Sequence, residues 1–337
     1  MKLTEQPSLS ILGAGSWGTA LAVSLAHGGH DVVLWGRSAE KIEAIRRERE
    51  NKQYLEGVVL PEEIELTSDL EYAVKNRDVV VCVVPAQAFR STFKSAAGFL
   101  GENTIVVNCA KGIEVGTQKR ISEIAKEIRP DLPFVVLSGP SHAEEVGRFL
   151  PTTLSAASED PSCAEYVQDL FMTDMMRVYA NDDVVGVEVA GALKNIIALA
   201  AGISDGMGYG DNAKAALMTR GLTEMARLGE KMGGSRMTFM GLSGLGDLIV
   251  TCTSMHSRNR RCGIMIGEGV KPEEAIRRVG MVVEGINTTE AVYALAKELS
   301  VEMPITEQLY QVIRGKVQGR DAVANLMLRK RKYESED

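Results

Sequence analysis

The chain has 337 residues, of which 45% are hydrophobic and 25% are charged. That balance is typical of a soluble globular protein and excludes an extended disordered chain or a coiled coil. The 38 basic residues are outnumbered by 45 acidic ones, which gives a net charge of -7. A general nucleic-acid binder is therefore not expected, because affinity for a phosphate backbone needs a basic surface.

We find no basic and apolar leader before Ser8 and no run of eighteen apolar residues. We therefore expect a cytoplasmic protein that does not insert into a membrane. The five cysteines are odd in number and widely spread, which fits a reducing compartment. Cys252, His256 and Cys262 lie close together, but no fourth ligand follows at a standard zinc spacing, so we predict no metal site.

The first half of the chain alternates short apolar, β-rich runs with helical segments. The runs cover residues 8–13, 31–36, 79–84, 104–110, 134–139, 152–157 and 175–181. Two helix starts are marked, by Ser68 with Glu71 as a capping box and by Asp160 before Pro161. Apolar strands separated by helices predict a doubly wound parallel sheet that is covered on both faces.

After about residue 181 the β pattern stops. Helical segments follow at residues 184–203, 211–233, 272–280, 288–300 and 306–315. We therefore predict an α/β protein of two domains. A Rossmann-like, dinucleotide-binding domain is expected over residues 1–181, and an all-helical, substrate-binding and catalytic domain over residues 182–337.

A glycine-rich turn, Gly13, Gly15 and Gly18 in the pattern GxGxxG, follows the first predicted strand directly and opens a helix. Such glycines permit a tight turn, a close approach of a pyrophosphate, and packing of helix on strand, while the helix N-terminus offers N–H groups to the anion. The strand, turn, helix and second strand come in the expected order, so we predict dinucleotide binding. The alternative is a turn whose glycines only permit positive φ.

Arg37 ends the second predicted strand, where an enzyme that uses NAD alone more often has an acidic residue. A guanidinium is suited to a 2′-phosphate, which favours NADPH or the use of both cofactors. The alternative is a surface arginine beside the helix cap Ser38.

Polar groups follow two later strands. Lys111 comes after the strand at residues 104–110, and Gly139 and Ser141 come after the strand at residues 134–139. Ligands of open parallel sheets bind beyond these carboxyl ends, so we expect the three residues to face a ligand. Lys111 could instead be an exposed loop lysine.

Lys194 and Asn195 are the only polar side chains between Val189 and Ile203, in a helix that is apolar all round and hence expected to be buried. Burial lowers the pKa of a lysine into a range useful for acid and base catalysis. A structural salt bridge is the alternative, but Glu188 lies six residues away and on another helix face.

Further polar residues lie downstream. Asp247 is predicted in a glycine-rich turn, and Ser257, Arg258 and Asn259 in a loop, where the arginine suits a phosphate. Taken alone, that basic loop could simply be solvated. Glu284 is a ligand candidate before a helix.

Together the segments GAGSWGTALA, NCAKGIE, LSGPSHAEEV, EVAGALKNIIALAAGI, GLSGLGDLIVTC, HSRNRRCG and VEGINTT resemble bacterial NAD(P)-dependent glycerol-3-phosphate dehydrogenases. The resemblance implies reversible reduction of dihydroxyacetone phosphate to sn-glycerol 3-phosphate for phospholipid synthesis. It implies cofactor contacts for Ser16, Trp17, Arg37, Lys111, Ala143, Arg258, Val282 and Glu284. It implies a substrate site formed by Lys111, Gly139, Ser141, Lys194, Asp247, Ser257, Arg258 and Asn259, with Lys194 as the proton donor and acceptor. For the chemistry of ketone reduction, we expect Lys111 and Asp247 to orient Lys194 and the substrate, and Arg258 and Asn259 to hold the phosphate.

Two other functions stay open on the residues alone. One is another two-domain nicotinamide-dependent dehydrogenase with a helix-borne lysine, of the hydroxyacid or phosphogluconate type. The other is a non-catalytic dinucleotide sensor, which would not need a buried lysine. A homodimer is an option that the sequence leaves open.

Overall fold

The computed structural model describes residues 6–331 and 333–334. The chain packs into two compact units. Unit 1 comprises Met1–Ala110 and Ile121–Val184, and unit 2 comprises Lys111–Arg120 and Val185–Asp337. Sequence reasoning did not anticipate that the ten residues Lys111–Arg120 pack with the helical unit.

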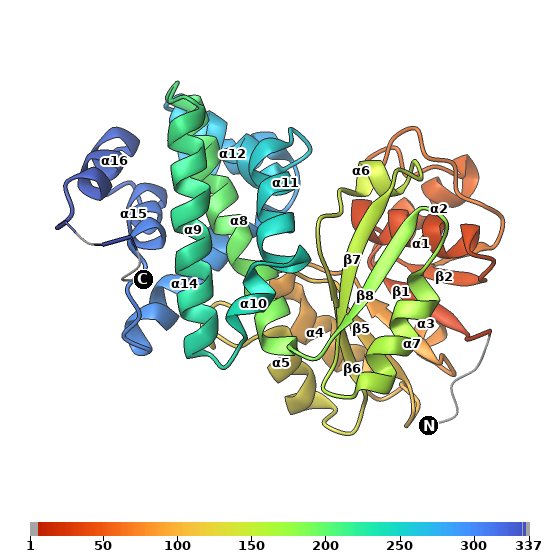
Figure 1. Cartoon of the computed structure of the whole chain (residues 1–337). Coiled ribbons are helices and arrows are strands. Elements are labelled where there is room, and N and C mark those ends of the chain that lie inside the picture. Colours follow the sequence, from red (N-terminus) through yellow and green to blue (C-terminus); the bar gives the residue numbers. More distant parts are fainter. Residues whose placement is uncertain (1–5, 332, 335–337) are drawn as a thin grey trace. The chain divides into compact units, whose positions relative to one another are not determined.

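Unit 1 is built on one eight-stranded sheet in the order β3-β2-β1-β4-β5-β6-β7-β8 (Figure 1). Strands β1 to β6 are mutually parallel, β7 runs antiparallel to β6, and β8 is parallel to β7. The prediction of a wholly parallel sheet is therefore wrong for the last two strands. The strands are β1 Leu9–Leu12, β2 Val32–Trp35, β3 Ile64–Thr67, β4 Val79–Cys82, β5 Ile105–Asn108, β6 Phe134–Ser138, β7 Thr152–Ala157 and β8 Met176–Asn181.

The sheet is buried on both faces, as the continuous apolar strands predict. In β1, for example, Leu9 and Ile11 join one core and Leu12 joins the other. The first core is covered by α1 Ser16–His27, α2 Ala39–Glu48, α6 Ala143–Val146 and α7 Pro161–Phe171. The second is covered by α3 Leu70–Val74, α4 Ala86–Ala96 and α5 Ile121–Ile128. The doubly wound, Rossmann-like architecture is confirmed.

Each predicted β-run contains a strand, but β3 was missed. Its residues alternate between buried and partly or fully exposed, so the segment lacks the continuous apolar run of the central strands. Of the two predicted helix caps, Asp160 before α7 is confirmed. The predicted cap at Ser68 is wrong by one residue. The side chain of Asp69 accepts from the Tyr72 N–H and caps α3.

In the described part of unit 2, all regular secondary structure is helical (Figure 1), and the segment Lys111–Arg120 forms turns without a helix or strand. Its elements are α8 Val184–Gly206, α9 Asp211–Lys231, α10 Arg236–Phe239, a π-helical turn Leu242–Gly246, α11 Asp247–Thr253, α12 Arg258–Gly267, α13 Pro272–Val279, α14 Glu284–Glu298, α15 Pro304–Ile313 and α16 Gly319–Met327. Two local predictions are corrected. Asp247 is the first residue of α11 rather than part of a loop, and Arg258 and Asn259 begin α12.

Helix α8 is the central helix of the unit 2 core. By length and composition it could span a membrane, although Glu188 and Lys194 interrupt its apolar run, and 89% of its most apolar window is buried in the protein. That burial is typical of a core helix of a soluble protein. Within the core, α8 meets α12 backbone to backbone, because a Cβ at Gly202 would lie 2.1 Å from the Arg260 carbonyl and one at Gly263 would lie 2.2 Å from that of Leu199.

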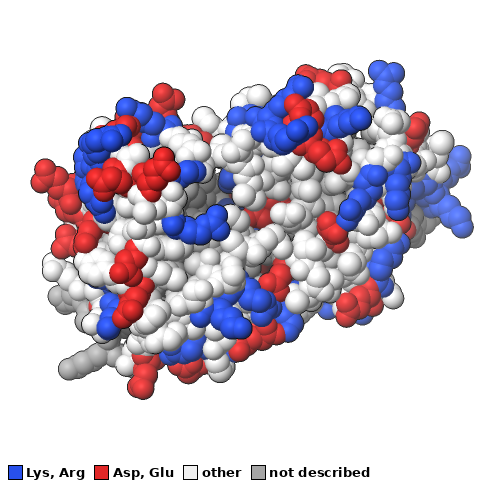
Figure 2. Space-filling view, turned by 180° about the vertical axis from the view of Figure 1, so that it is seen from behind, with Lys and Arg blue, Asp and Glu red and all other residues white. Residues whose placement is uncertain are grey.

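The face of the molecule in Figure 2 carries Lys and Arg side chains interspersed with Asp and Glu. No continuous basic surface is seen on that face. This distribution agrees with the net charge of -7.

Candidate active site

Three charged side chains from distant parts of the sequence meet inside unit 2. Asp247 at the start of α11 accepts from the Lys194 Nζ at 3.0 Å through Oδ1, and from the Lys111 Nζ at 2.6 Å through Oδ2. Asp247 and Lys194 are 1% and 7% exposed. The structure therefore brings together the three residues that the sequence analysis assigned to catalysis.

Lys194 is buried because it projects from the apolar core helix α8, as predicted. Burial lowers its pKa to about 8, and the neighbouring Lys111 cation acts in the same direction, while Asp247 opposes both. The amine is thus held where it can exist in both protonation states near neutral pH. Glu188 is not its partner, since that carboxylate accepts from Arg120 instead.

Asp247 stays ionised for a complementary reason. Burial alone would raise the pKa of this carboxyl, but the two lysine cations outweigh burial and lower it. The Thr251 hydroxyl, one turn further along α11, accepts from the Lys194 Nζ at 2.8 Å and donates to the Asp247 carbonyl at 2.6 Å. Sequence reasoning missed Thr251, although its spacing from Asp247 on a recognised helix would have revealed it.

A chain of amide hydrogen bonds connects this cluster to the start of α14. The Asn195 Nδ2 donates to the Lys111 carbonyl at 3.2 Å, and the Asn259 Nδ2 donates to the Asn195 Oδ1 at 2.9 Å. The Asn259 Oδ1 accepts from the Gly285 N–H at 2.8 Å. Asn259 therefore already uses both ends of its amide group within the protein, which leaves one N–H of its Nδ2 for other acceptors.

The remaining residues proposed in unit 2 gather at two helix starts. Ser257 is buried and caps α12 by accepting from the Arg260 N–H, and Arg258 follows it half-buried. Glu284 is half-buried at the first position of α14, and Val282, just before it, is 41% exposed. Asn259 and the Gly285 N–H join these two starts.

The glycine turn of unit 1 has the form expected of a pyrophosphate cradle. It lies at the sheet's switch point, where the strand order reverses between β1 and β4. Gly13 has φ +127°, and a Cβ on Gly18 would lie 1.9 Å from the Gly13 carbonyl. A Cβ on Gly15 would meet nothing within 4 Å. The backbone is therefore open on the side from which an anion would approach the start of α1.

Other proposed cofactor and ligand residues also lie in unit 1. Ser16 and Trp17 open α1 half-buried, and Arg37 is exposed two residues after β2. Gly36 beside Arg37 packs against the turn, because a Cβ there would lie 3.1 Å from that of Ala14. Ala143 is buried at the start of α6.

Gly139 follows β6 with φ +139°, a conformation that favours glycine. The Ser141 hydroxyl donates to the Gly139 carbonyl at 2.9 Å. This local hydrogen bond shapes the turn after β6. The oxygen of the Ser141 hydroxyl can still accept a hydrogen bond from a ligand hydroxyl.

The three residues that raised the question of zinc differ in their environments. Cys252 and Cys262 are buried, which raises the pKa of their thiols to about 12 and about 11, whereas His256 is exposed. Among residues 6–331, 333 and 334, no group of three or more His, Cys, Asp or Glu side chains is placed to hold a metal ion.

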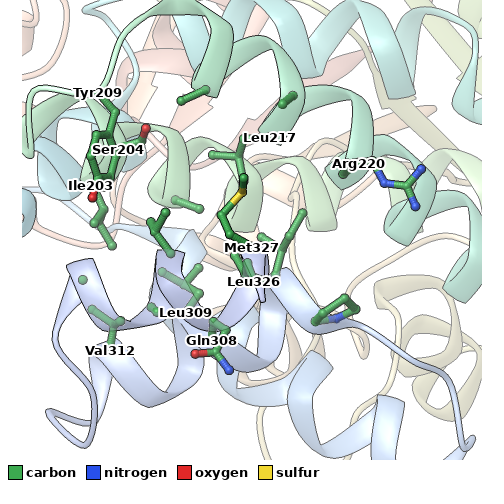
Figure 3. Close-up of a pocket in the computed structure, with 18 of the residues that line it drawn as sticks. Ile203, Ser204, Tyr209, Leu217, Arg220, Gln308, Leu309, Val312, Leu326 and Met327 are labelled. Atoms are coloured by element: carbon green, nitrogen blue, oxygen red, sulfur yellow. The ribbon is translucent and has the colours of Figure 1, made fainter. Parts of the chain in front are cut away.

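A separate cavity of about 310 Å³ lies elsewhere in unit 2, between α8, α9, α15 and α16 (Figure 3). Its walls are mostly apolar, with Leu217, Leu309 and Leu326 among them, and none of the lysine cluster lines it. Glu224 is buried in its wall and accepts from the backbone N–H groups of Ile305 and Thr306 at the start of α15. The site chemistry therefore does not coincide with this cavity.

Comparison with known proteins agrees with the geometry. Residues 8–164 match the family model described as NAD-dependent glycerol-3-phosphate dehydrogenase N-terminus, and residues 183–324 match the corresponding C-terminus model. This chain belongs to the NAD-dependent glycerol-3-phosphate dehydrogenase family. The family resemblance that its motifs indicated is thereby confirmed, and the protein is an NAD(P)-dependent oxidoreductase.

Individual members of the glycerol-3-phosphate dehydrogenase family match over nearly the whole chain. The protein named glycerol-3-phosphate dehydrogenase [NAD(P)+] of Bacillus pumilus is 53% identical over 98% of this chain and 96% of its own length. The one from Bacillus thuringiensis is 55% identical over 97% of both. A crystal structure of glycerol-3-phosphate dehydrogenase from Coxiella burnetii has a TM-score of 0.93 at 40% identity and covers 96% of this chain and 99% of its own.

Proposed function

We propose that this dehydrogenase reduces dihydroxyacetone phosphate to sn-glycerol 3-phosphate, reversibly, with Lys194 as the group that gives and takes the proton. The observation that supports this role most directly is the buried Lys194 ammonium on the shared carboxylate of Asp247. When bound, NADPH or NADH supplies the hydride. Reduction of a ketone turns its oxygen into an alkoxide, which needs a proton and nearby positive charge.

Each residue of the lysine cluster has a defined part in this proposal. Lys194 gives its proton to the substrate oxygen and is left as a neutral amine, which burial makes accessible near neutral pH. Lys111, whose Nζ lies 2.6 Å from the Asp247 Oδ2, adds a second cation beside the developing negative charge. Asp247 and Thr251 fix the direction of the Lys194 Nζ. In the reverse reaction the neutral amine removes the alcohol proton.

The substrate phosphate is assigned to the start of α12. Arg258 has the planar fork that suits a phosphate, and the N-terminus of α12 adds backbone N–H groups. Asn259 has an unassigned amide hydrogen, and Ser257, Gly139 and Ser141 are further contacts for substrate oxygens. Fixing a remote dianion positions the reacting carbon, which contributes to the rate.

The cofactor is assigned to the glycine turn of unit 1, whose open Gly15 and uncapped helix start fit a pyrophosphate. Ser16, Trp17, Ala143, Val282 and Glu284 are proposed as its further contacts. Arg37 beside the turn favours NADPH over NADH without excluding NADH. We also propose a cytoplasmic location and a role in supplying glycerol phosphate for membrane lipids.

The test of this proposal is turnover by the purified protein. NADPH should be oxidised when dihydroxyacetone phosphate is added, and not when a 2-keto acid is added instead. In the opposite direction, glycerol 3-phosphate but not 6-phosphogluconate should reduce the oxidised cofactor. Absence of turnover with the phosphorylated ketone would refute the proposed substrate.

The role of Lys194 has its own test. Lys194→Ala should lower kcat by about 10²-fold to 10⁴-fold, the usual contribution of a general acid, and leave cofactor affinity in a fluorescence titration nearly unchanged. Lys214→Met is the control, because Lys214 is another lysine of unit 2 that is paired with a carboxylate, that of Asp205 at 2.9 Å, but its side chain is 18% exposed. Full turnover in Lys194→Ala would contradict the assignment.

A further inference from the structure

The ten-residue segment Lys111–Arg120, the excursion, is hydrogen-bonded to α8 at both of its ends. At its start, the Asn195 Nδ2 donates to the Lys111 carbonyl at 3.2 Å. At its end, the Arg120 guanidinium donates to the Glu188 carboxylate at 2.7 Å. The two anchor points on α8 lie seven positions apart, which is two helical turns.

The excursion is also tightly folded between its ends. The Glu114 N–H donates to the Lys119 carbonyl at 3.0 Å, and the Gln118 N–H donates back to the Glu114 carbonyl at 3.0 Å. The Ile113 side chain, 1% exposed, joins the unit 2 core. Because these hydrogen bonds join residue 114 to residues 118 and 119, the two ends of the segment are tied to each other in one compact loop.

The ion pair at the end of the excursion is mostly withdrawn from solvent. The Arg120 side chain is 14% exposed and that of Glu188 is 5% exposed. A pair in such surroundings is not needed for solubility, and an exposed pair would contribute little to holding a loop. A buried pair favours one relative placement of the two segments, because moving them apart breaks a charge-assisted hydrogen bond.

We propose that Arg120 and Glu188 are positioning residues for the reaction, because their ion pair holds the excursion on α8 and thereby holds Lys111 against Asp247. This inference rests on the proposed function. It adds two residues that touch neither substrate nor cofactor in that proposal. It also gives a reason for an ion pair on the same core helix that carries Lys194.

The inference has a measurable electrostatic consequence. The charged and titratable groups that act on Lys194 are Asp247, Lys111 and the Cys252 thiol. If Lys111 moves away, Lys194 loses a repelling cation and has Asp247 to itself, so its ammonium form is stabilised. Reduction requires that form, and the high-pH limb of kcat for reduction should then move to higher pH.

The first experiment uses Glu188→Gln in the full-length enzyme. We expect kcat for reduction to fall about tenfold to a hundredfold, as misplacement by about 1 Å can cause, and its high-pH limb to move upward. Because this variant leaves Arg120 charged and could unfold, the double variant Arg120→Met with Glu188→Leu is measured beside it. It removes both charges, so it should fold and show the same two changes.

The decisive experiment is a double-mutant cycle with Lys111→Met. If Glu188 acts through Lys111, Glu188→Gln should lower kcat by less than about twofold in the Lys111→Met background and should not move its pH limb further. An equal loss of kcat in both backgrounds would overturn the proposal, because it would show a general structural effect. An unshifted pH limb in Glu188→Gln alone would overturn it as well.

A control separates this role from the stability of unit 2. Glu224→Gln alters another buried carboxylate of the unit, which contacts α15 and not the excursion, so it should leave the pH limb in place. Amide hydrogen exchange over residues 111–120 reads the anchor without any turnover. Faster exchange there in Glu188→Gln, in a protein inactive with every ketone tested, would refute the proposed function while the anchoring still held.

Discussion

Lys194 and Asp247 are 53 positions apart in the sequence, and the Nζ of the lysine donates to the Oδ1 of the aspartate at 3.0 Å inside the core of unit 2. The two groups stabilise each other in their charged forms. Burial pulls the lysine toward its neutral form, and the carboxylate limits that shift to a pKa of about 8. Lys194 can therefore gain and lose a proton near neutral pH, while Asp247 stays ionised.

This balance predicts opposite pH dependences for the two directions of the reaction. Reduction of the ketone needs the Lys194 ammonium, so kcat for reduction should be steady at low pH and fall as pH rises through about 8. Oxidation of the alcohol needs the neutral amine, so its kcat should rise over the same interval. Stopped-flow measurement of the hydride step in both directions checks this. Two limbs of the same sign would be inconsistent with Lys194 as the proton carrier.

Asp247→Asn should act on Lys194 in the direction opposite to a change at Lys111. Without the carboxylate, burial is no longer opposed and the pKa of Lys194 falls below about 8. The high-pH limb of reduction should move downward, and kcat at neutral pH should fall by about 10²-fold or more, since the lysine also loses its orientation. Thr251→Ser serves as the control, because it keeps the hydroxyl to which the Lys194 Nζ donates.

The choice of cofactor is tested at Arg37. Arg37→Ala should raise KM for NADPH by about tenfold or more, because a guanidinium contact with a 2′-phosphate is charge-assisted. KM for NADH should change little. Steady-state kinetics with each cofactor in turn measure the two KM values. Equal losses would mean that Arg37 does not contact the 2′-phosphate.

The close contact of α8 and α12 predicts a steric penalty. Gly202→Ala would place a Cβ 2.1 Å from the Arg260 carbonyl, so the helices must separate, at a cost of about 1–3 kcal/mol or more in the free energy of unfolding. Gly210→Ala is the matched control, since a Cβ there meets nothing within 4 Å, and it should cost less than about 1 kcal/mol. Urea unfolding measures both, and similar midpoints would argue against the close contact.

Glu224 predicts a pH dependence of stability. Burial raises its pKa from 4.5 to about 7, partly offset by the N–H groups of Ile305 and Thr306. The folded state then binds the proton more tightly than the unfolded state, so this group stabilises below about pH 4.5 and its contribution is lost as pH rises to about 7. Glu224→Gln removes that loss. Relative to the natural protein, its free energy of unfolding should improve by up to about 3 kcal/mol between pH 5 and pH 8. A constant difference would count against the raised pKa.

The sequence predicts most of the fold because the fold depends on local patterns. Continuous apolar runs identify the buried strands, and the all-apolar surroundings of Lys194 identify a buried lysine. The direction of β7 escaped prediction, because an apolar strand reads the same whether it pairs parallel or antiparallel. β3 escaped because an edge strand that is half exposed lacks the apolar run.

The candidate site was predictable in its residue types and not in its connections. Lys111, Lys194 and Asp247 each stand out locally, but nothing in their neighbourhoods says that one carboxylate holds both lysines. Thr251 was hidden because α11 follows a glycine-rich π-helical turn that resembles a loop. Arg120 and Glu188 were hidden because a pairing across 68 positions depends on where the excursion packs.

The excursion also bears on how the protein is made and divided. The strands of unit 1 are synthesised before Asp247. Lys111 can therefore pair with the Asp247 carboxylate only after the helices of unit 2 have been added to the chain. A fragment cut after the last strand would carry Lys111 without its carboxylate, and the helical remainder would carry Lys194 without its second cation. Recombining the two units of this enzyme with those of a relative must therefore exchange residues 111–120 together with the helices, or the new protein inherits half of a proton-transfer site.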